Sequence, residues 1–556
     1  MRNMFGKKSR IISILLCAFM LTWTLFGCGA EKDSDAEDEL SDEMSAFEVA
    51  ADQREMASEN KADYSVLDAG RGNPNWINTQ ARYAFSRFME YALGECEGAM
   101  PEDGMGGEAV QKGIGERFTA AMDPNNETDA FLIDAVDYCV ERLGMDRDEL
   151  VKELVDGIIG DYYPSPSRCL TNTEVILNEY LQSTLYKGVD LADETDVFPT
   201  EGGSAAMTYI FDSLTHNRLL NPGDRIAIGT PIFTPYLEIP SVKDYDLVTV
   251  DVANTEENGW DYTKEEMDKL KDPSIKAFFL VNPSNPASHA LSEKTLKYLK
   301  QVVKENPDLI ILTDDVYGTF VEDFQTVYSV LPYNTILVYS YSKLYGATGW
   351  RVGMIAMNKN NVCDRLLRGL SDEDKEYLKD EYDIVTDEPE KFPFIERVVA
   401  DSRSIGLYHT SGLSTPSQVF MDFLALSHLI YGEEDPYIQR ANKVVNERYE
   451  TLMKALGLEP DESVSNAKYY VIVDIDDLAK ENYGKEFADW LHEEKPEKEF
   501  LDDLAERKGV VLMYGPGFKA PEGTVRISMA NLEKDDYKEL ARRMFELLDE
   551  YEKEMK

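Results

Sequence analysis

SYSKLYGATGWRVG, residues 340–353, follows the apolar run Thr335–Tyr339 and leads into a second one, Val352–Met357. The segment between them holds one lysine, Lys343, among small polar residues. A lysine that directly follows an apolar strand is costly to bury unless it has a partner. The pattern therefore predicts a strand, a functional turn that carries Lys343, and a second strand.

The same alternation extends on both sides of this segment. Short β-rich runs, each bounded by Gly, Pro, Asn or Asp, alternate with helix-like stretches such as Gly203–Leu214 and Glu293–Glu305. The β-rich runs are Arg225–Ile228, Lys276–Val281, Leu309–Thr313, Thr335–Tyr339 and Val352–Met357. Strands that alternate with helices predict an α/β fold with a mostly parallel sheet covered by helices.

The predicted domains follow from changes in this texture. Residues 166–434 form the large domain, with a densely charged surface insertion at about 371–394. Residues 435–556 form a smaller α+β domain. Residues 61–165 supply the N-terminal part of the small domain and an arm that crosses the site.

The N-terminus is typical of an export signal. Arg2, Lys7, Lys8 and Arg10 precede an apolar run at 11–26 that is shorter than the ~20 residues of a membrane-spanning helix. The run ends at Leu25-Phe26-Gly27-Cys28, which resembles the lipobox of bacterial lipoproteins, with a bulky Phe26 as a departure. Residues 1–28 are therefore predicted to be a lipoprotein signal with Cys28 lipidated. The chain is then anchored on the extracytoplasmic face; a cytoplasmic location is the alternative.

Residues 29–60 are strongly acidic, with Lys32 and Arg54 as the basic residues, and are predicted to be a disordered tether. The whole chain has 57 basic and 105 acidic residues, a formal net charge of −48. That charge argues against nucleic acid and anionic lipid as electrostatic partners, so the membrane is reached through the lipid anchor alone. The spacing of the cysteines and histidines matches no metal motif, and no metal site is predicted.

Polar and aromatic residues follow the predicted strands. In a parallel sheet, ligands bind beyond the carboxyl ends of the strands. The residues at these positions are Gly203, Ser204, Phe233, Asn285, Asp314, Tyr317, Ser340, Lys343 and Arg351.

These residue types match the needs of one cofactor. A Gly-Gly-Ser helix start with an arginine and serines nearby suits a phosphate. An aromatic ring can stack on a planar ligand, and an aspartate can hold a protonated ring nitrogen. A lone lysine can form a Schiff base with an aldehyde. Together these requirements describe pyridoxal phosphate.

Residues 340–353 resemble the lysine signature of fold-type I aminotransferases, S-x-S-K-x-x-x-x-x-x-x-R-x-G. Further elements of that family follow in order: Asn-Pro-x-Asn-Pro at 282–286, Asp-x-x-Tyr at 314–317 and Arg-Ile-Ser at 526–528. The resemblance implies that Lys343 binds the cofactor covalently and later moves protons. It implies that Asp314 pairs with the pyridine nitrogen, that Tyr317 and Asn285 bond the ring oxygen, and that Phe233 stacks on the ring.

The resemblance assigns the remaining roles as well. Gly203, Ser204, Ser340 and Arg351 would hold the phosphate, and Tyr162 would reach the phosphate of a neighbouring subunit. Arg526 would bind the α-carboxylate of the substrate. The family glycine after Asn-Pro-x-Asn-Pro-x is Ser288 here, so the loop is predicted to turn differently.

Two stretches are similar to a branch of this family, the aspartate 4-decarboxylases: Gly-Arg-Gly-Asn-Pro-Asn-Trp at 70–76 and Tyr-His-Thr-Ser-Gly-Leu-Ser-Thr-Pro at 408–416. The likeness implies conversion of L-aspartate to L-alanine and CO₂, with a side activity as an aspartate aminotransferase. Exclusion of water from the site is expected to set the balance between the two. Arg71 is the predicted contact of the distal carboxylate.

The resemblance also implies a homo-oligomer, a dimer or larger, and 2-oxoglutarate is a further candidate substrate. The alternative function is that of a plain aspartate or aromatic aminotransferase. A more remote alternative is a lipid-anchored binding protein that keeps the fold without the chemistry.

Overall fold

The computed structural model describes residues 45–556 except 63, 101, 103 and 243–244. These residues form one compact unit built on a seven-stranded sheet. The strand order is β2 (Thr195–Thr200), β8 (Gly353–Asn358), β7 (Thr335–Ser340), β6 (Ile310–Asp314), β5 (Ile275–Val281), β3 (Arg225–Thr230) and β4 (Val248–Ala253). Strand β8 runs antiparallel to β2 and β7, and the other neighbours are parallel. The predicted mostly parallel sheet is confirmed, and β2 and β4 extend it beyond the five predicted runs.

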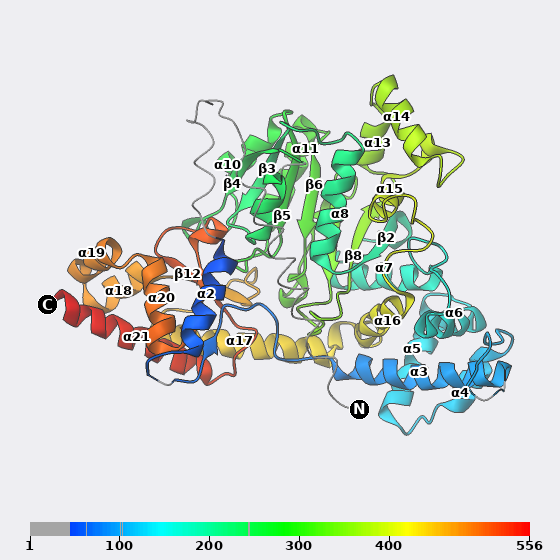
Figure 1. The fold of residues 1–556 in the computed structure, drawn as a ribbon, viewed down its shortest axis with the longest axis horizontal. Helices are drawn as coiled ribbons and strands as arrows, with labels where there is room; N and C mark the ends of the chain where they lie inside the picture. Colours follow the sequence, from blue (N-terminus) through cyan, green and yellow to red (C-terminus); the bar gives the residue numbers. More distant parts are fainter. Residues whose placement is uncertain (1–44, 63, 101, 103, 243–244) are drawn as a thin grey trace, which may run out of the picture. The chain divides into compact units, whose positions relative to one another are not determined.

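Both faces of the sheet are buried, which explains why its strands are continuous apolar runs. In β5, Ala277 and Phe279 pack in the cluster that contains α8 (Gly203–His216), while Phe278 and Leu280 pack against α11 (Glu293–Glu305). Alternate side chains of a strand point to opposite faces, so each strand supplies two cores. Figure 1 shows these helices beside the strands.

Other helices complete this part of the structure. They are α7 (Thr171–Leu185), α9 (Pro235–Glu238), α10 (Lys264–Asp268), α12 (Val327–Val330), α13 (Val362–Arg368), α14 (Asp372–Tyr382), α15 (Phe394–Asp401) and α16 (Thr415–Leu429). The charged segment predicted as an insertion contains α14, which lies at the periphery in Figure 1. Its Tyr382 is buried and donates a hydrogen bond to Asp401 at 2.7 Å.

The predicted domain boundary assigned residues 61–165 to the small C-terminal domain and an arm. The helices between residues 79 and 159 do not join that C-terminal part. They are α3 (Thr79–Ala99), α4 (Ile114–Ala121), α5 (Glu127–Arg142) and α6 (Arg147–Ile159). Helices α3, α5 and α6 pack against the almost wholly buried α16. A 15-residue helix buried on all sides needs partners around it, and these helices supply them.

The C-terminal part contains a three-stranded antiparallel sheet of β11 (Met513–Tyr514), β12 (Thr524–Ser528) and β9 (Tyr470–Asp474). Its helices are α17 (Pro436–Leu456), α18 (Ile475–Tyr483), α19 (Lys485–Glu494), α20 (Glu497–Lys508) and α21 (Asp536–Met555). Strand β10 (Val510–Val511) pairs in parallel with β1 (Leu67–Asp68) from the N-terminal side.

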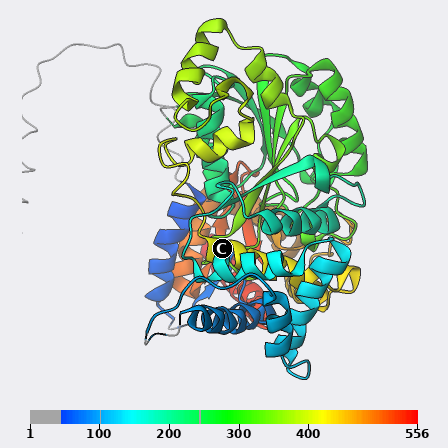
Figure 2. The same ribbon diagram turned by 90° about the vertical axis from the view of Figure 1, so that its right-hand side faces the viewer.

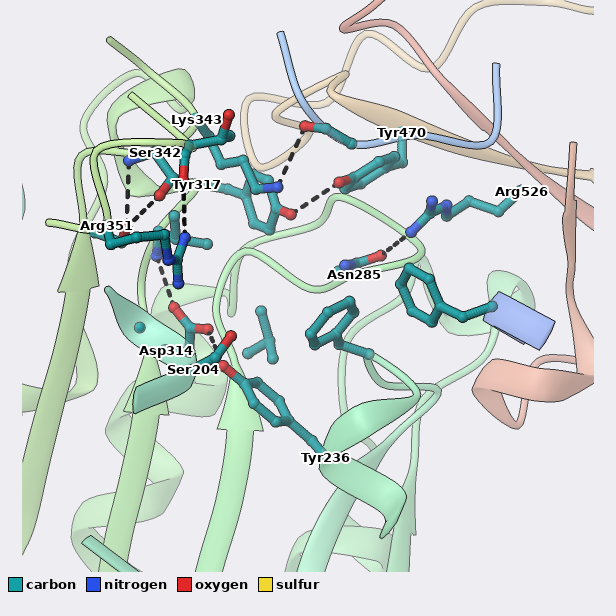
Figure 3. Close-up of a pocket in the computed structure, with 18 residues that line it drawn as sticks. Ser204, Tyr236, Asn285, Asp314, Tyr317, Ser342, Lys343, Arg351, Tyr470 and Arg526 are labelled. Carbon is teal, nitrogen blue, oxygen red and sulfur yellow. Dashed lines mark hydrogen bonds between the residues drawn. The ribbon is translucent and has the colours of Figure 1, made fainter. Parts of the chain in front are cut away.

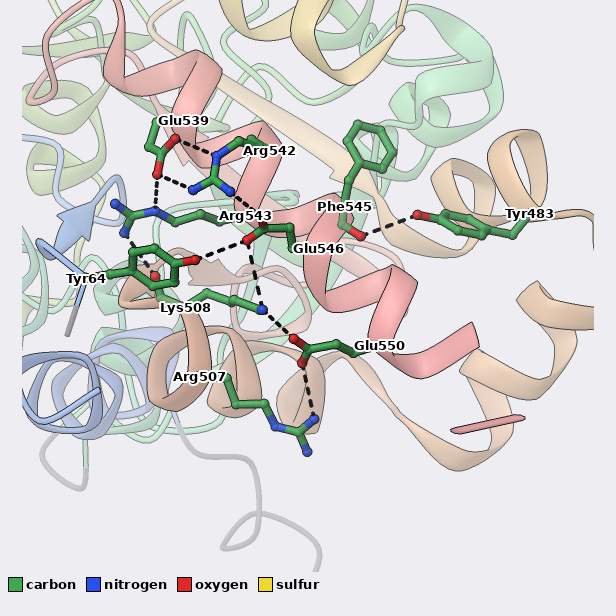
Figure 4. Close-up of polar contacts among 10 residues, drawn as sticks. All are labelled: Tyr64, Tyr483, Arg507, Lys508, Glu539, Arg542, Arg543, Phe545, Glu546 and Glu550. Carbon is green, nitrogen blue, oxygen red and sulfur yellow. Dashed lines mark hydrogen bonds and ion pairs between the residues drawn. The ribbon is translucent and has the colours of Figure 1, made fainter. Parts of the chain in front are cut away.

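Buried charges hold this N-terminal strand in place. Arg543, 3% exposed, donates to the carbonyl oxygens of Ser65 at 2.7 Å and Lys508 at 2.9 Å, and pairs with Glu539. Lys508 in turn pairs with Glu550 at 2.6 Å (Figure 4). A buried arginine needs all of these acceptors, so α20, α21 and the chain before β1 are tied together.

The predicted tether is wrong for its second half. Residues 46–58 form helix α2 (Ala46–Ser58), capped by Ser45 and packed on α20; Figures 1 and 2 both show the blue α2 against the orange α20. Small residues, Ala46, Ala50 and Ala57, recur at helical spacing and are fully buried. The same face buries Val49 and Gln53, and the amide of Gln53 donates to Asp502 of α20 at 3.2 Å. The predicted signal, Cys28 and the rest of the tether lie outside the described residues. Within the described residues, no helix has the length and apolar character to cross a bilayer.

Candidate active site

The carboxyl ends of β5, β6 and β7 open into a cavity of about 250 Å³ (Figure 3). The strand register places Val281 opposite Asp314, and Asp314 opposite Val338. The loops that follow these strands therefore carry their side chains into one space. The N-terminus of α8, the segment around Gly72 and the C-terminal strands β9 and β12 complete the lining.

Asp314 lies at the floor of this cavity and is 7% exposed. Its Oδ2 accepts a hydrogen bond from Tyr236 at 2.7 Å, and its Oδ1 accepts one from the amide of Val316 at 3.2 Å. Burial raises the pKa of Asp314, and these two bonds and the charge of Lys343 oppose the rise. Burial disfavours the ionised form of a carboxylate, and a nearby cation offsets this cost. A carboxylate held this way can therefore pair with a protonated ring nitrogen.

Lys343 enters the cavity from the turn after β7. Its Nζ lies 3.3 Å from the carbonyl oxygen of Gly72, which also accepts a hydrogen bond from Tyr469 at 2.8 Å. A β-carbon on Gly72 would lie 2.1 Å from the hydroxyl of Tyr470, so this position requires glycine. The close approach of the Gly72 backbone leaves the lysine amine facing the cavity (Figure 3).

One end of the cavity is suited to a phosphate. Helix α8 begins there, and the backbone N–H groups of its first turn lack helical partners. Gly202 precedes it with φ 87°, and a β-carbon there would lie 2.6 Å from the guanidinium of Arg351. Arg351 itself has φ 55°, a conformation that costs energy in a non-glycine residue and is concentrated at functional sites. Ser340 and Ser342 share a hydrogen bond of 2.8 Å beside it.

The opposite end is built around Arg526, which is 2% exposed. It donates to Asn285 Oδ1 at 2.9 Å and to the carbonyl oxygen of Gly70 at 2.6 Å, and its Nε has no partner among the described residues. Its guanidinium lies 4.2 Å from the ring centre of Tyr470, whose hydroxyl is 2.9 Å from that of Tyr317. Burial lowers the pKa of Arg526, and the neighbouring tyrosines oppose this. An anionic carboxylate would satisfy the buried cation.

The structure brings most of the predicted site residues into this one cavity. They are Gly203, Ser204, Phe233, Asn285, Asp314, Tyr317, Ser340, Lys343, Arg351 and Arg526. Tyr162 lies outside the lining and is 50% exposed, so its predicted contact with a neighbouring subunit stays a prediction.

Arg71 is not brought into the cavity. Its Nε pairs with Asp68 at 3.0 Å, and its side chain is 57% exposed. In this segment the part that faces Lys343 is the backbone carbonyl of Gly72. The structure therefore does not support the predicted contact of Arg71 with the distal carboxylate.

The predicted change of turn after Asn285 is also corrected. Ser288 has φ 64°, the left-handed conformation that glycine favours. The loop thus adopts a glycine-like turn with a serine, and the hydroxyl of Ser288 accepts a hydrogen bond from the amide of Tyr470 at 2.7 Å.

Several lining residues were not predicted from the sequence. Tyr236 stands three residues after Phe233, and Ser342 and Thr348 lie inside the lysine signature, so their positions carried a signal. Tyr470 and Phe47 carried none, since they come from distant strand β9 and helix α2.

The arrangement fits pyridoxal phosphate. A buried aspartate faces the cavity floor, an amine enters from one side, and an anion cradle stands at the end formed by α8 and Arg351. A second cation, Arg526, lines the other end and provides for a carboxylate there.

Comparison with known proteins gives the same picture. The sequence profile of the family "Aminotransferase class I and II" matches residues 177–544. A bifunctional aspartate aminotransferase and L-aspartate beta-decarboxylase of Pseudomonas sp. is 41% identical over 512 residues, which is 91% of this chain and 96% of that protein. An asparagine–oxo-acid transaminase of Streptococcus mutans is 26% identical over 56% of this chain and 67% of its own.

Solved structures share the fold. An aspartate aminotransferase double mutant of Thermus thermophilus superposes with a TM-score of 0.59 at 17% identity, covering 93% of this chain and all of that one. An aromatic aminotransferase of Pyrococcus horikoshii superposes with a TM-score of 0.57 at 19% identity, covering 90% and 99%.

Proposed function

The chain belongs to the class I and II aminotransferase family, and we propose that it is a pyridoxal phosphate enzyme that converts L-aspartate to L-alanine and CO₂. It also acts as an aspartate aminotransferase. The observation that carries the chemistry is the single cavity lined by Lys343, Asp314, Arg351 and Arg526. The decarboxylation is inferred from the 41% identical relative, which spans nearly the whole chain.

Bound pyridoxal phosphate supplies an electron sink for bonds at the substrate's α- and β-carbons. The chain's own residues position the substrate and move its protons. Arg526 binds the α-carboxylate, because it is the buried cation that lines the end of the cavity opposite Arg351. Asp314 keeps a positive charge on the ring nitrogen, which strengthens the electron sink.

Lys343 is placed to transfer protons. Its amine reaches the cavity from the side of Gly72, and it can take the Cα proton of the substrate and return it. The β-carboxylate leaves as CO₂, and one proton takes its place on Cβ to give L-alanine. Transamination instead requires water in the same space, so apolar side chains such as Phe47 and Phe233 favour decarboxylation.

The deciding experiment uses L-aspartate as the only substrate, without a keto acid. Many turnovers that yield alanine and CO₂ in equal amounts support the proposal. Product that stops at one equivalent of oxaloacetate per site would assign a plain aminotransferase. The variant Lys343→Ala, expected to lose at least on the order of 10²-fold in rate, excludes a contaminating activity.

We further propose that the enzyme is a homo-oligomer in which Tyr162 reaches the cofactor phosphate of a neighbouring subunit. Its exposure and its place outside its own chain's cavity support this assignment. Sedimentation measures the assembly, and Tyr162→Phe is expected to weaken cofactor binding. A monomer with full activity would contradict the proposal.

The location of the enzyme is a separate proposal. The basic start, the apolar run and Cys28 support export and a lipid anchor on the extracytoplasmic face. Labelling cells with palmitate is expected to mark the wild type and not Cys28→Ser. Absence of label from both would favour the cytoplasmic alternative.

A further inference from the structure

The loop after β5, residues 282–291, is joined by backbone hydrogen bonds to a C-terminal segment, residues 461–470. The amide of Ala467 donates to the carbonyl oxygen of Ser288 at 2.8 Å, and the amide of Ala290 donates to the carbonyl oxygen of Ser465 at 2.8 Å. His289 and Asn466 form an antiparallel bridge between these two bonds. This ribbon joins the loop that carries Asn285 to the strand that begins at Tyr470.

His289 stands at the centre of the ribbon and is 7% exposed. Its Nδ1 lies 2.7 Å from the carbonyl oxygen of Ala287, and its Nε2 lies 2.5 Å from Asp461 Oδ2. The two ring nitrogens therefore tie His289 to two oxygen atoms, the Ala287 carbonyl and the Asp461 carboxylate.

Asp461 is suited to remain ionised. Partial burial raises its pKa, but the contacts with His289 and with the amide of Ser463 outweigh burial, and the net pKa is lowered. Its own amide donates to the hydroxyl of Tyr449 at 2.9 Å. The carboxylate is thus a fixed acceptor, and His289 anchors the loop to it.

The ribbon ends in the cavity. The hydroxyl of Ser288 accepts a hydrogen bond from the amide of Tyr470. The guanidinium of Arg526 lies over the ring of Tyr470, whose hydroxyl contacts that of Tyr317. On the same loop, Asn285 accepts a hydrogen bond from Arg526. Two of the groups that hold Arg526 in place, Asn285 and Tyr470, therefore depend on this loop, and the carbonyl oxygen of Gly70 is a third that does not.

We propose that Ser288 and His289 are positioning residues for the substrate's α-carboxylate: His289 locks the loop to Asp461, and Ser288 fixes Tyr470 against Arg526. This inference rests on the proposed function, since it assumes that Arg526 binds a dicarboxylic substrate. It goes beyond that function because neither residue lines the cavity.

The test measures binding of maleate, an unreactive dicarboxylate, to the holoenzyme by calorimetry. Ser288→Gly is the sharpest variant, because glycine favours the φ of 64° and loses the CH₂OH group whose oxygen accepts from Tyr470. His289→Gln removes the ring that spans the Ala287 carbonyl and Asp461. Each is expected to raise the maleate dissociation constant on the order of tenfold, the size of one lost hydrogen bond. The double variant is expected to bind no more weakly than the weaker single variant.

The matched control is His492→Gln. His492 also contacts an aspartate, Asp476, at 2.7 Å, but its side chain is 55% exposed. Its maleate affinity is expected to equal that of the wild type. Unchanged affinity in both Ser288→Gly and His289→Gln, or equal losses in all three variants, would overturn the inference. A wild type that binds no maleate would instead count against the proposed function.

Discussion

The hydroxyl of Tyr236 donates a 2.7 Å hydrogen bond to Asp314, the carboxylate at the floor of the cavity. Both side chains are buried, at 3% and 7% exposure. Asp314 must be ionised to stabilise a protonated ring nitrogen, and burial works against its ionised form. Tyr236 is one of the groups that offsets this effect.

Tyr236→Phe is therefore expected to raise the pKa of Asp314 further. A group whose pKa rises becomes protonated at a higher pH, so the variant should lose activity earlier as the pH falls. We expect kcat/KM at neutral pH to fall on the order of tenfold. The pH profile of kcat/KM provides the measurement. Tyr298→Phe, which removes a similar contact with Asp268 away from the cavity, serves as the control; identical profiles for both variants would contradict the assignment.

Gly72→Ala is expected to damage both the site and the fold. The new β-carbon would lie 2.1 Å from the Tyr470 hydroxyl and 3.3 Å from Lys343 Nζ. Overpacking of this kind typically costs about 1–3 kcal/mol. Denaturant unfolding and kcat report the two effects. Gly94→Ala in α3, where no described atom apart from the neighbouring residues and backbone of its own helix lies within 4 Å of the added carbon, should instead stabilise by ~0.5–1 kcal/mol.

Asp315 predicts a distinct pH dependence of stability. It is fully buried, and burial raises its pKa to about 8. Between its ordinary value of 3.8 and about 8, the folded state holds a proton that the unfolded state releases. Stability therefore falls as pH rises through this window, by up to about 1.4 kcal/mol per unit. Asp315→Asn should remove this slope of the unfolding free energy against pH, measured by urea unfolding from pH 5 to 8. Equal slopes in the wild type and the variant would rule out such a titration of Asp315.

Phe47→Ala should change the products more than the rate. Phe47 reaches the cavity from α2, and its ring centre lies 5.5 Å from that of Phe233. Its loss opens an apolar part of the lining to water, so the ratio of oxaloacetate to alanine should rise several-fold. Both products are quantified from L-aspartate. Met56→Ala on the same helix, 37% exposed against 38% for Phe47, is the matched control; equal product ratios would remove Phe47 from this role.

The order of strands and helices, and the residues at strand ends, were predictable because they depend on local pattern. Asp314, Ser340 and Lys343 each follow a buried apolar run, and parallel strands bring such positions to one edge. The predicted helix 293–305 and the observed α11 have the same bounds, since Ser292 supplies a local cap. The tether was predicted wrongly because its buried face consists mostly of alanines, with Val49 and a buried Gln53, so its apolar period is weak.

The sequence by itself therefore determined the chemistry: the lysine, the aspartate, the anion cradle and Arg526 are identifiable from motif and spacing. Only the tertiary structure decided which residues hold them. Tyr236, Tyr470, Phe47 and the ribbon at His289 meet the site through packing between segments far apart in the chain. Arg71 is held by a contact that is local in the chain, since its Nε pairs with Asp68 three residues earlier, and the position of that pair outside the cavity is seen only in the structure.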